Sequence, residues 1–121
     1  FRKINSELKN YSLKGSIHCF SGSYEMAINF IKLGFLLGFG GVCTYKNAKN
    51  VKNVIKNIDL EYILLETDSP YLTPEPYRMK QNTSAYLPLI AREIANIKGV
   101  SVDAVARVTT NNARICFFDL K

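Results

Sequence analysis

Two acidic residues follow an apolar run near the middle of the chain. The run Ile-Leu-Leu at 63–65 leads directly into Glu66, Thr67 and Asp68, and Pro70 follows shortly after. Such a run predicts a buried parallel strand with the acids at its C-terminal edge, where ligands bind in α/β proteins. Because side chains alternate along a strand, we expect Glu66 and Asp68 on one face. Buried acids need a cation or a hydrogen-bond donor; the alternative is that Asp68 caps the turn before Pro70.

The single histidine of the chain also stands at the end of a short segment. Residues 15–20, Gly-Ser-Ile-His-Cys-Phe, predict a compact strand with His18 near its C-terminal end. An imidazole and a carboxylate at one edge of a sheet are ligands that divalent metal ions accept. The alternative is that this histidine has only a structural role. We expect the neighbouring Cys19 to point to the opposite face and pack in the core.

A long loop with prolines follows the acidic strand, from Ser69 to Thr83. Loops of this length after a strand end are more often functional than an ordinary connection. Arg78 can bind a phosphate through its planar fork of N–H groups, and Lys80 can bind one as a point charge. The alternative for both residues is a solvated loop.

The apolar periodicity of the remaining sequence predicts helices between strands. This alternation predicts parallel pairing through right-handed crossovers, and therefore an α/β fold of about three parallel strands with flanking helices. The pair Gly40-Gly41 ends the second strand and permits a close backbone approach. We expect strands over 15–20, 35–39 and 62–66, and helices over 2–11 and from Ser23, Asn47, Leu87, Ser101 and Thr110 or Asn111.

The length of 121 residues is enough for one domain with one core. A hydrophobic content of 47% and a charged content of 21% indicate a globular protein. No apolar run reaches membrane-span length, no signal peptide is recognisable, and three separated cysteines without a CxxC pair favour a reducing cytoplasm. Because the chain begins at Phe1 and a three-stranded sheet leaves two unpaired edges, we expect a part of a larger α/β unit.

The net charge of +6 favours polyanionic partners. Lys46, Lys49, Lys52 and Lys56 form a basic stripe along one predicted helix, and no acid occurs between Val42 and Ile58. The alternative for this basic stripe is a solvated outer face.

Five blocks of the sequence stand out. They are His-Cys-Phe-Ser-Gly-Ser at 18–23, Gly-Phe at 34–35 with Gly-Gly at 40–41, Thr-Tyr-Lys-Asn at 44–47, Leu-Glu-Thr-Asp-Ser-Pro-Tyr-Leu at 65–72 and Thr-Thr-Asn-Asn-Ala-Arg at 109–114. In this order they together resemble the TatD family, whose members are metal-dependent hydrolases related to the amidohydrolases. The resemblance extends over nearly the whole chain from about residue 14.

The resemblance implies a fold. The family fold is a (β/α)₈ barrel, and the blocks resemble its strands six, seven and eight. Residues 1–121 are therefore expected to be a single partial-barrel domain from the C-terminal part of a TIM-type barrel. The His-x-His pair, the mid-chain Glu and the further His of the earlier family strands have no counterpart in this chain, which contains one histidine.

The resemblance also implies a site and an activity. His18 and Asp68 match metal ligands, and Asp68 matches the residue that orients or deprotonates the attacking water. Glu66 is expected to support the ligands from a deeper position. The implied cofactor is divalent zinc, magnesium or manganese, and the implied reaction is hydrolysis of DNA phosphodiester bonds as a deoxyribonuclease. Because a catalytic zinc usually has three protein ligands, we expect the isolated chain to be inactive.

The long loop departs in part from the family pattern. Arg78 and Asn82 match family positions and, with Lys80, are candidates for substrate binding, whereas Met79 does not match the usual glycine. Two alternatives to catalysis stay open. The chain could be a basic part-barrel that binds nucleic acid through the basic stripe without cleaving it, or one that self-associates through its exposed sheet edges.

Overall fold

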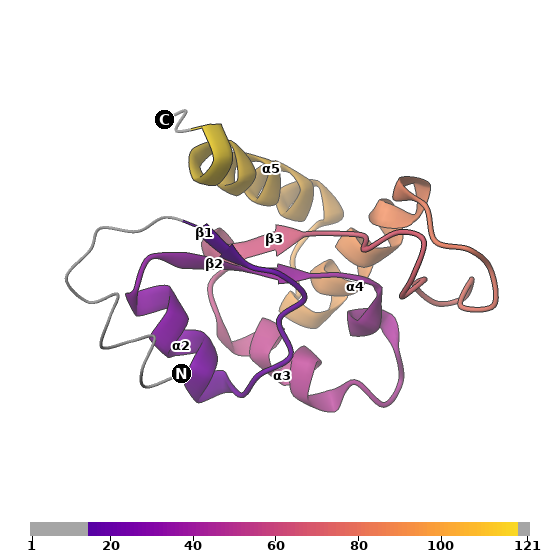
Figure 1. Ribbon diagram of the computed structural model, residues 1–121, viewed down its shortest axis with the longest axis horizontal. Helices are drawn as coiled ribbons and strands as arrows, with labels where there is room; N and C mark the ends of the chain where they lie inside the picture. The colour runs from indigo at the N-terminus through magenta and orange to yellow at the C-terminus, as the bar shows by residue number, and fades with distance from the viewer. Residues whose placement is uncertain (1–14, 119–121) are drawn as a thin grey trace.

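Three parallel strands form the centre of the fold, and helices cover both faces of the sheet (Figure 1). The computed structural model describes residues 15–118. The strands β1 (Gly15–Ile17), β2 (Phe35–Phe39) and β3 (Ile63–Leu65) pair side by side in chain order. All three predicted strands are confirmed, although β1 and β3 are shorter than expected. The helix expected over residues 2–11 lies outside the described residues.

The register of the sheet separates two rows of side chains. Ser16 pairs with Leu36, and Gly38 pairs with Leu64, so these four positions share one face. The opposite face contributes to the hydrophobic core, which the helices complete. Its largest fully buried side chains are Leu37, Phe39 and Ile63.

The helices begin and end near the predicted capping residues. Helix α2 (Tyr24–Lys32) begins after Ser23, whose Oγ accepts a hydrogen bond from the N–H of Met26 at 3.2 Å. Helix α4 (Leu87–Lys98) ends at Gly99, whose φ of 67° is the left-handed conformation that glycine favours. The other elements are α3 (Lys49–Asn57), α5 (Val102–Phe118) and three 3₁₀ turns over Gly41–Thr44, Leu60–Tyr62 and Ser84–Tyr86.

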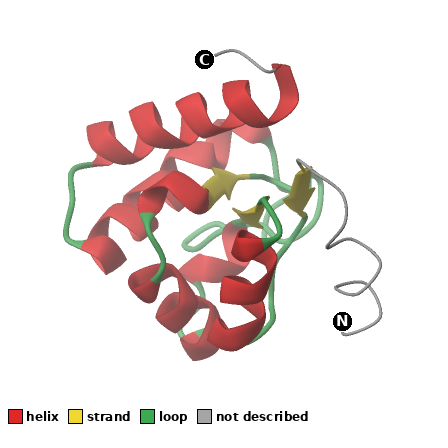
Figure 2. Cartoon of the chain, turned by 90° about the vertical axis from the view of Figure 1, so that its left-hand side faces the viewer, coloured by secondary structure: helices red, strands yellow, loops and turns green. Residues whose placement is uncertain are grey.

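The helices enclose the sheet from several directions. Helix α5 lies on one side of the sheet, and α2 and α3 lie on the other (Figure 1). The end view shows helices around the three short strands (Figure 2). None of the helices in residues 15–118 is long and apolar enough to cross a membrane.

A single helix replaces the two that the sequence predicts after Gly99. Helix α5 continues through Thr110 and Asn111, where a new N-cap was expected, so that prediction is wrong. Thr109 instead donates to a carbonyl one turn back in α5 at 2.7 Å. Asn112 donates to two carbonyls at and just before the start of β3, at 3.0 and 2.9 Å. These bonds use the polar side chains without interrupting the helix, and they fasten α5 to β3.

The basic stripe is only partly a free surface. Lys46, Lys49 and Lys56 are exposed, but the ammonium of Lys52 lies 3.5 Å from the carboxylate of Glu93 on α4. The acid that is absent from the local sequence is therefore supplied by the neighbouring helix.

Candidate metal centre

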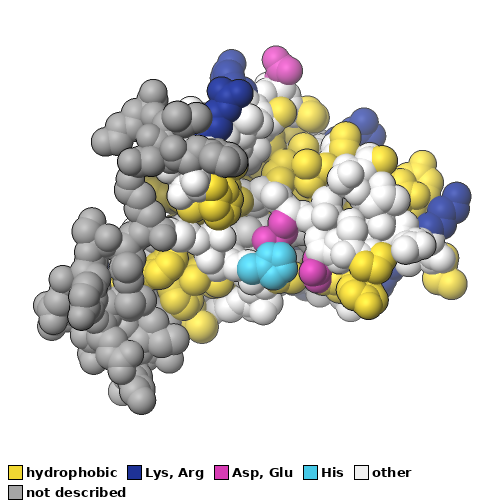
Figure 3. Space-filling view, turned by 45° about the horizontal axis from the view of Figure 1, so that its top comes forward, with side chains coloured by type: hydrophobic (Ala, Val, Ile, Leu, Met, Phe, Trp, Pro, Cys, Tyr) yellow, Lys and Arg dark blue, Asp and Glu magenta, His cyan; other side chains and the backbone are white. Residues whose placement is uncertain are grey.

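His18 lies between two carboxylates at the C-terminal edge of the sheet. Its Nδ1 is 2.8 Å from Oε2 of Glu66, and its Nε2 is 3.6 Å from Oδ1 of Asp68. Figure 3 shows the histidine at the surface with an acidic side chain on either side. The side chain of His18 is 61% exposed, that of Asp68 is 40% exposed and that of Glu66 is 17% exposed. The three residues predicted for the site are thus brought together.

Glu66 reaches His18 by crossing the middle strand. Glu66 follows β3, His18 follows β1, and β2 lies between them. The crossing point is Gly38, where an added Cβ would lie 2.2 Å from Oε2 of Glu66. Any side chain at this position would therefore occupy the space of the carboxylate.

The carboxylate of Glu66 has two donors. It accepts hydrogen bonds from Nδ1 of His18 and from the main-chain N–H of Cys19. Burial raises the pKa of Glu66, and the charge of His18 and these hydrogen bonds oppose that rise. Since Nδ1 of His18 donates to Glu66, the proton of the neutral imidazole is assigned to Nδ1 and the lone pair to Nε2. Glu66 therefore turns the free nitrogen of His18 toward Asp68.

Asp68 reaches the site through a turn and not through strand alternation. Strand β3 ends at Leu65, and Asp68 has a left-handed backbone with φ of 55°. The carbonyl of Asp68 accepts a hydrogen bond from the N–H of Tyr71 at 2.9 Å. Thr67 provides the side-chain contact of this turn, since its Oγ1 accepts from the N–H of Ser69 at 3.4 Å. The carboxylate of Asp68 is consequently left to face His18.

Cys19 does not pack in the core as expected. The strand ends at Ile17, and Cys19 has a left-handed backbone with φ of 53°, so alternation no longer sets its direction. The partly buried thiol lies near Glu66 and Asp68. Burial, and then the charges of Glu66 and Asp68, raise the pKa of the Cys19 thiol. Left-handed non-glycine residues are strained and concentrate at functional sites. Cys19 and Asp68 are two such residues within this one small site.

His18 and Asp68 fit as two ligands of one divalent ion. A separation of 3.6 Å between Nε2 and Oδ1 is too long for a hydrogen bond. Ligand bonds of about 2.0–2.2 Å place neighbouring ligands of one ion roughly 3–3.5 Å apart. Within residues 15–118, no three His, Cys, Asp or Glu side chains form a metal-binding group. Glu66 and Asp68 instead meet opposite nitrogens of the imidazole.

The loop residues predicted for substrate binding make internal contacts. The guanidinium of Arg78 lies 3.8 Å from the ring centre of Tyr45 and 3.9 Å from the carboxylate of Glu75. The ammonium of Lys80 lies 5.5 Å from the ring centre of Tyr77, within cation–π range. Both side chains hold the loop together and remain accessible at its surface.

Asn82 is 4% exposed and fixes the conformation of the loop. Its Nδ2 donates to the carbonyl of Thr67 at 2.6 Å and to that of Tyr71 at 2.7 Å. The two amide hydrogens therefore bond one carbonyl before Asp68 in the sequence and one after it. This arrangement favours a positioning role for Asn82.

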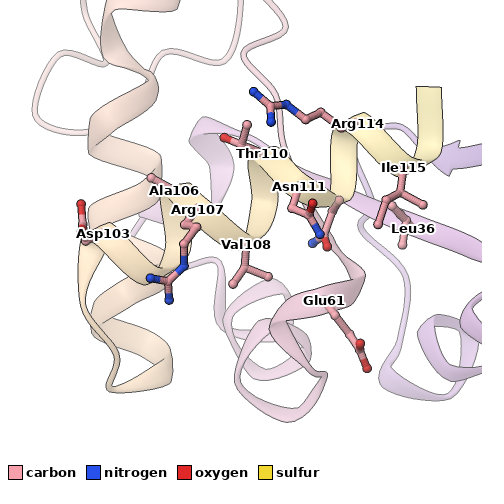
Figure 4. A pocket seen from close by; sticks show the side chains of 11 residues that line it. Leu36, Glu61, Asp103, Ala106, Arg107, Val108, Thr110, Asn111, Arg114 and Ile115 are labelled. Atoms are coloured by element: carbon pink, nitrogen blue, oxygen red, sulfur yellow. The ribbon is translucent and has the colours of Figure 1, made fainter. Parts of the chain in front are cut away.

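Two hollows lie beside α5. One, of about 620 Å³, adjoins His18 and Glu66 and is otherwise lined mainly by apolar side chains of β3, α4 and α5. The other, of about 880 Å³, lies between α5 and the beginnings of β2 and β3. Figure 4 shows that Arg107 and Arg114 in this second hollow extend in different directions. Their guanidinium groups therefore do not converge on one point.

Gly38 is the residue that sequence reasoning missed. The apolar run 35–39 contains one glycine, and a glycine inside a strand often marks a close approach by another group. The same argument was applied to Gly40-Gly41 and is confirmed there, because a Cβ on Gly41 would lie 2.0 Å from the carbonyl oxygen of Leu72.

Comparisons with known proteins identify the family of the chain. A family model described as TatD related DNase matches residues 1–118. The chain is 45% identical over 103 residues to the uncharacterized metal-dependent hydrolase YabD of Bacillus subtilis, covering 85% of this chain and 40% of that protein. It is 35% identical over 106 residues to the 3'-5' ssDNA/RNA exonuclease TatD of Pantoea ananatis, covering 84% of this chain and 41% of that protein.

A solved structure shows the same fold. YJJV, a TatD homologue from Escherichia coli K12, superposes with a TM-score of 0.86 at 29% identity, covering 99% of this chain and 47% of that one. The predicted fold class, an α/β segment of a (β/α)₈ barrel, is confirmed. The chain spans about 40% of the length of the curated relatives that it matches.

Proposed function

Because the chain belongs to the TatD family of related DNases, we propose that it is part of a metal-dependent hydrolase that cleaves DNA phosphodiester bonds. The observation that carries the proposal is the placement of His18 between Glu66 and Asp68. The names of two relatives, a metal-dependent hydrolase and an exonuclease of single-stranded DNA and RNA, support the reaction class.

We assign a separate role to each of the three residues. His18 would hold a divalent ion through Nε2, and Asp68 would hold it through a carboxylate oxygen. Glu66 holds the imidazole ring and keeps the proton on Nδ1, as carboxylates commonly do behind a metal-binding histidine. With zinc, magnesium or manganese bound there, the pKa of a water molecule would be lowered and charge on the phosphoryl oxygens neutralised.

Asp68 is the catalytic residue in this proposal. Its side chain is 40% exposed, so its second oxygen can reach a water molecule at the open edge of the sheet. That oxygen orients the water and accepts its proton as the new bond from oxygen to phosphorus forms. The P–O bond to one sugar breaks in the same displacement, and the departing sugar oxygen takes up a proton from solvent. Arg78 and Lys80 are proposed to hold flanking phosphates at the outer end of the site.

The test is cleavage of an end-labelled oligodeoxynucleotide by the full-length protein. We expect EDTA to abolish cleavage, added divalent metal to restore it, and Asp68→Asn to reduce kcat about 100-fold or more. The matched control is Asp103→Asn, an exposed acid of the first turn of α5, which should leave kcat unchanged. Cleavage that survives both EDTA and Asp68→Asn would refute the proposal.

This chain contributes two ligands, fewer than the three that a catalytic zinc usually has. We therefore expect residues 1–121 alone to show little or no cleavage. The cytoplasm remains the expected location, which the free thiols of Cys19 and Cys43 suit.

Non-catalytic DNA binding by the basic stripe is less favoured, because Lys52 is already paired with Glu93. Charge reversal at Lys49 tests it. A binding role requires that DNA affinity depend on salt and be weaker in this variant.

Self-association through the outer edges of β1 and β3 is a separate prediction. Sedimentation of the chain tests it, and a strictly monomeric profile would remove it.

A further inference from the structure

An exposed aromatic side chain stands one turn away from Asp68. Tyr71 is 70% exposed, although it belongs to the ordered turn that begins at Asp68. Its N–H donates to the carbonyl of Asp68 at 2.9 Å, and its own carbonyl accepts from Asn82 at 2.7 Å. Residues joined by such a turn have Cα atoms less than about 7 Å apart. The backbone of Tyr71 is thus fixed close to that of Asp68, while most of the Tyr71 side chain faces solvent.

Strained backbone on either side holds Tyr71 in this position. Asp68 and Leu72 both have left-handed backbones with φ of 55°. For a non-glycine residue this conformation costs about 1–3 kcal/mol and persists only where surrounding contacts enforce it. One such contact is at Gly41, where the carbonyl oxygen of Leu72 occupies the space that a Cβ would need. The fold therefore keeps this segment in a conformation that lowers the stability of the protein.

The other aromatic rings of this region are engaged within the protein. Tyr77 stacks on Tyr86 with ring centres 4.8 Å apart and planes at 7°. Tyr45 is buried, its hydroxyl donates to a loop carbonyl, and Arg78 covers its ring. These contacts occupy the rings of Tyr45, Tyr77 and Tyr86. Tyr71 differs from them in being mostly exposed to solvent.

We propose that Tyr71 is a stacking platform for an unpaired nucleobase of the strand whose phosphodiester lies at His18 and Asp68. The proposal rests on the proposed function, since it requires a nucleic-acid strand at that edge of the sheet. Aromatic rings bind unpaired bases by stacking, and the interaction tolerates every base because each has a π face. A duplex buries those faces, so Tyr71 selects single-stranded over double-stranded substrate.

The test pairs a protein variant with a ligand variant. In the full-length protein with EDTA, fluorescence anisotropy measures binding of a short oligodeoxynucleotide and of its counterpart with abasic residues, which has the same phosphates. We expect Tyr71→Leu to weaken binding of the first about 5- to 150-fold and binding of the abasic strand less than 2-fold. Tyr71→Phe keeps the ring and should bind both as the wild type does.

Two controls make the result specific. Tyr62→Leu removes a tyrosine that precedes β3 at the opposite end of the strand, and it should change neither affinity. Raising the salt concentration should weaken all complexes but leave the ratio between normal and abasic strands unchanged, because stacking releases no counterions.

An equal loss for normal and abasic strands, or none with either, overturns the proposal, as does equal weakening of duplex binding. Because binding is measured without metal, failure of the proposed hydrolysis is separately visible. A base-dependent effect of Tyr71 with no metal-dependent cleavage refutes the proposed function alone.

Discussion

Replacement of Gly38 by alanine should disturb the metal centre although Gly38 itself cannot bind a metal. The new Cβ would lie 2.2 Å from Oε2 and 2.9 Å from Cδ of Glu66. At these distances the carboxylate must shift away from position 38. It then loses Nδ1 of His18, now at 2.8 Å, and the N–H of Cys19.

The size of the effect follows from these contacts. A hydrogen bond to a charged group contributes about 1.5–3 kcal/mol, and the lower figure applies because the freed carboxylate regains water. Two such bonds amount to about 3 kcal/mol. Replacing glycine by alanine inside a strand returns about 0.5–1 kcal/mol by reducing the entropy of the unfolded chain. We therefore expect Gly38→Ala to lower the free energy of unfolding by about 2 kcal/mol.

Gly38→Ala should also weaken metal binding, and by more than a substitution at an ordinary surface site would. Loss of the group that orients a metal-binding histidine weakens affinity about 10- to 100-fold. Isothermal titration with Zn²⁺ or Mn²⁺ and urea unfolding measure the two quantities. Gly15→Ala is the matched control, since its Cβ meets only the ring of Phe35, at 3.1 Å, at the far end of β1.

The double variant tests the reasoning itself. Glu66→Gln weakens the same two contacts, so Gly38→Ala and Glu66→Gln should be strongly non-additive in metal affinity. Additive losses, or unchanged metal affinity in Gly38→Ala, would refute the claim that this glycine acts through Glu66.

Three further predictions concern other parts of the fold. Burial raises the pKa of Cys43 from an ordinary value of 9.0 to about 12. The thiol therefore adds stability below pH 9 that is lost as the pH rises toward 12. Between pH 8 and pH 10 the free energy of unfolding, measured with urea, should fall by about 1.4 kcal/mol more in the wild type than in Cys43→Ala. Lys98→Met should cost about 1–2 kcal/mol in the same assay, because the ammonium donates to the carbonyls of Ile55 and Ile58 at the end of α3; an unchanged midpoint would contradict this. Asn82→Ala should cost about 1–3 kcal/mol and speed proteolysis within the long loop, because it leaves two carbonyls without their donor; equal proteolysis rates would contradict it.

The strands were predictable because their sequence signals are local. The run at 35–39 matches β2 in both bounds, and the capping signals of Ser23 and Gly99 are confirmed. The division of α5 was predicted wrongly because Thr110 and Asn111 are good caps in isolation. What overrides that preference is a contact with residues about 50 positions away, between Asn112 and the start of β3, and periodicity carries no information about it.

The sequence predicted which three side chains lie together at the sheet edge but not how they are arranged. Strand-end placement and the family resemblance named His18, Glu66 and Asp68. The sequence could not show that Asp68 arrives through a left-handed turn, because alternation applies only within a strand. Nor could it show which nitrogen of His18 faces which acid. That detail depends on Gly38 clearing a path across β2, which is a property of three strands together.

The nitrogen resonances of His18 test the central claim most directly. The chain has one histidine, so a long-range ¹H–¹⁵N spectrum of the imidazole reports this residue alone. We expect the proton on Nδ1, held by Glu66, and a shift of Nε2 when Zn²⁺ is added that is lost in Asp68→Asn. A proton on Nε2, or a zinc-induced shift at Nδ1, would contradict the assignment of Nε2 and Asp68 as the metal ligands.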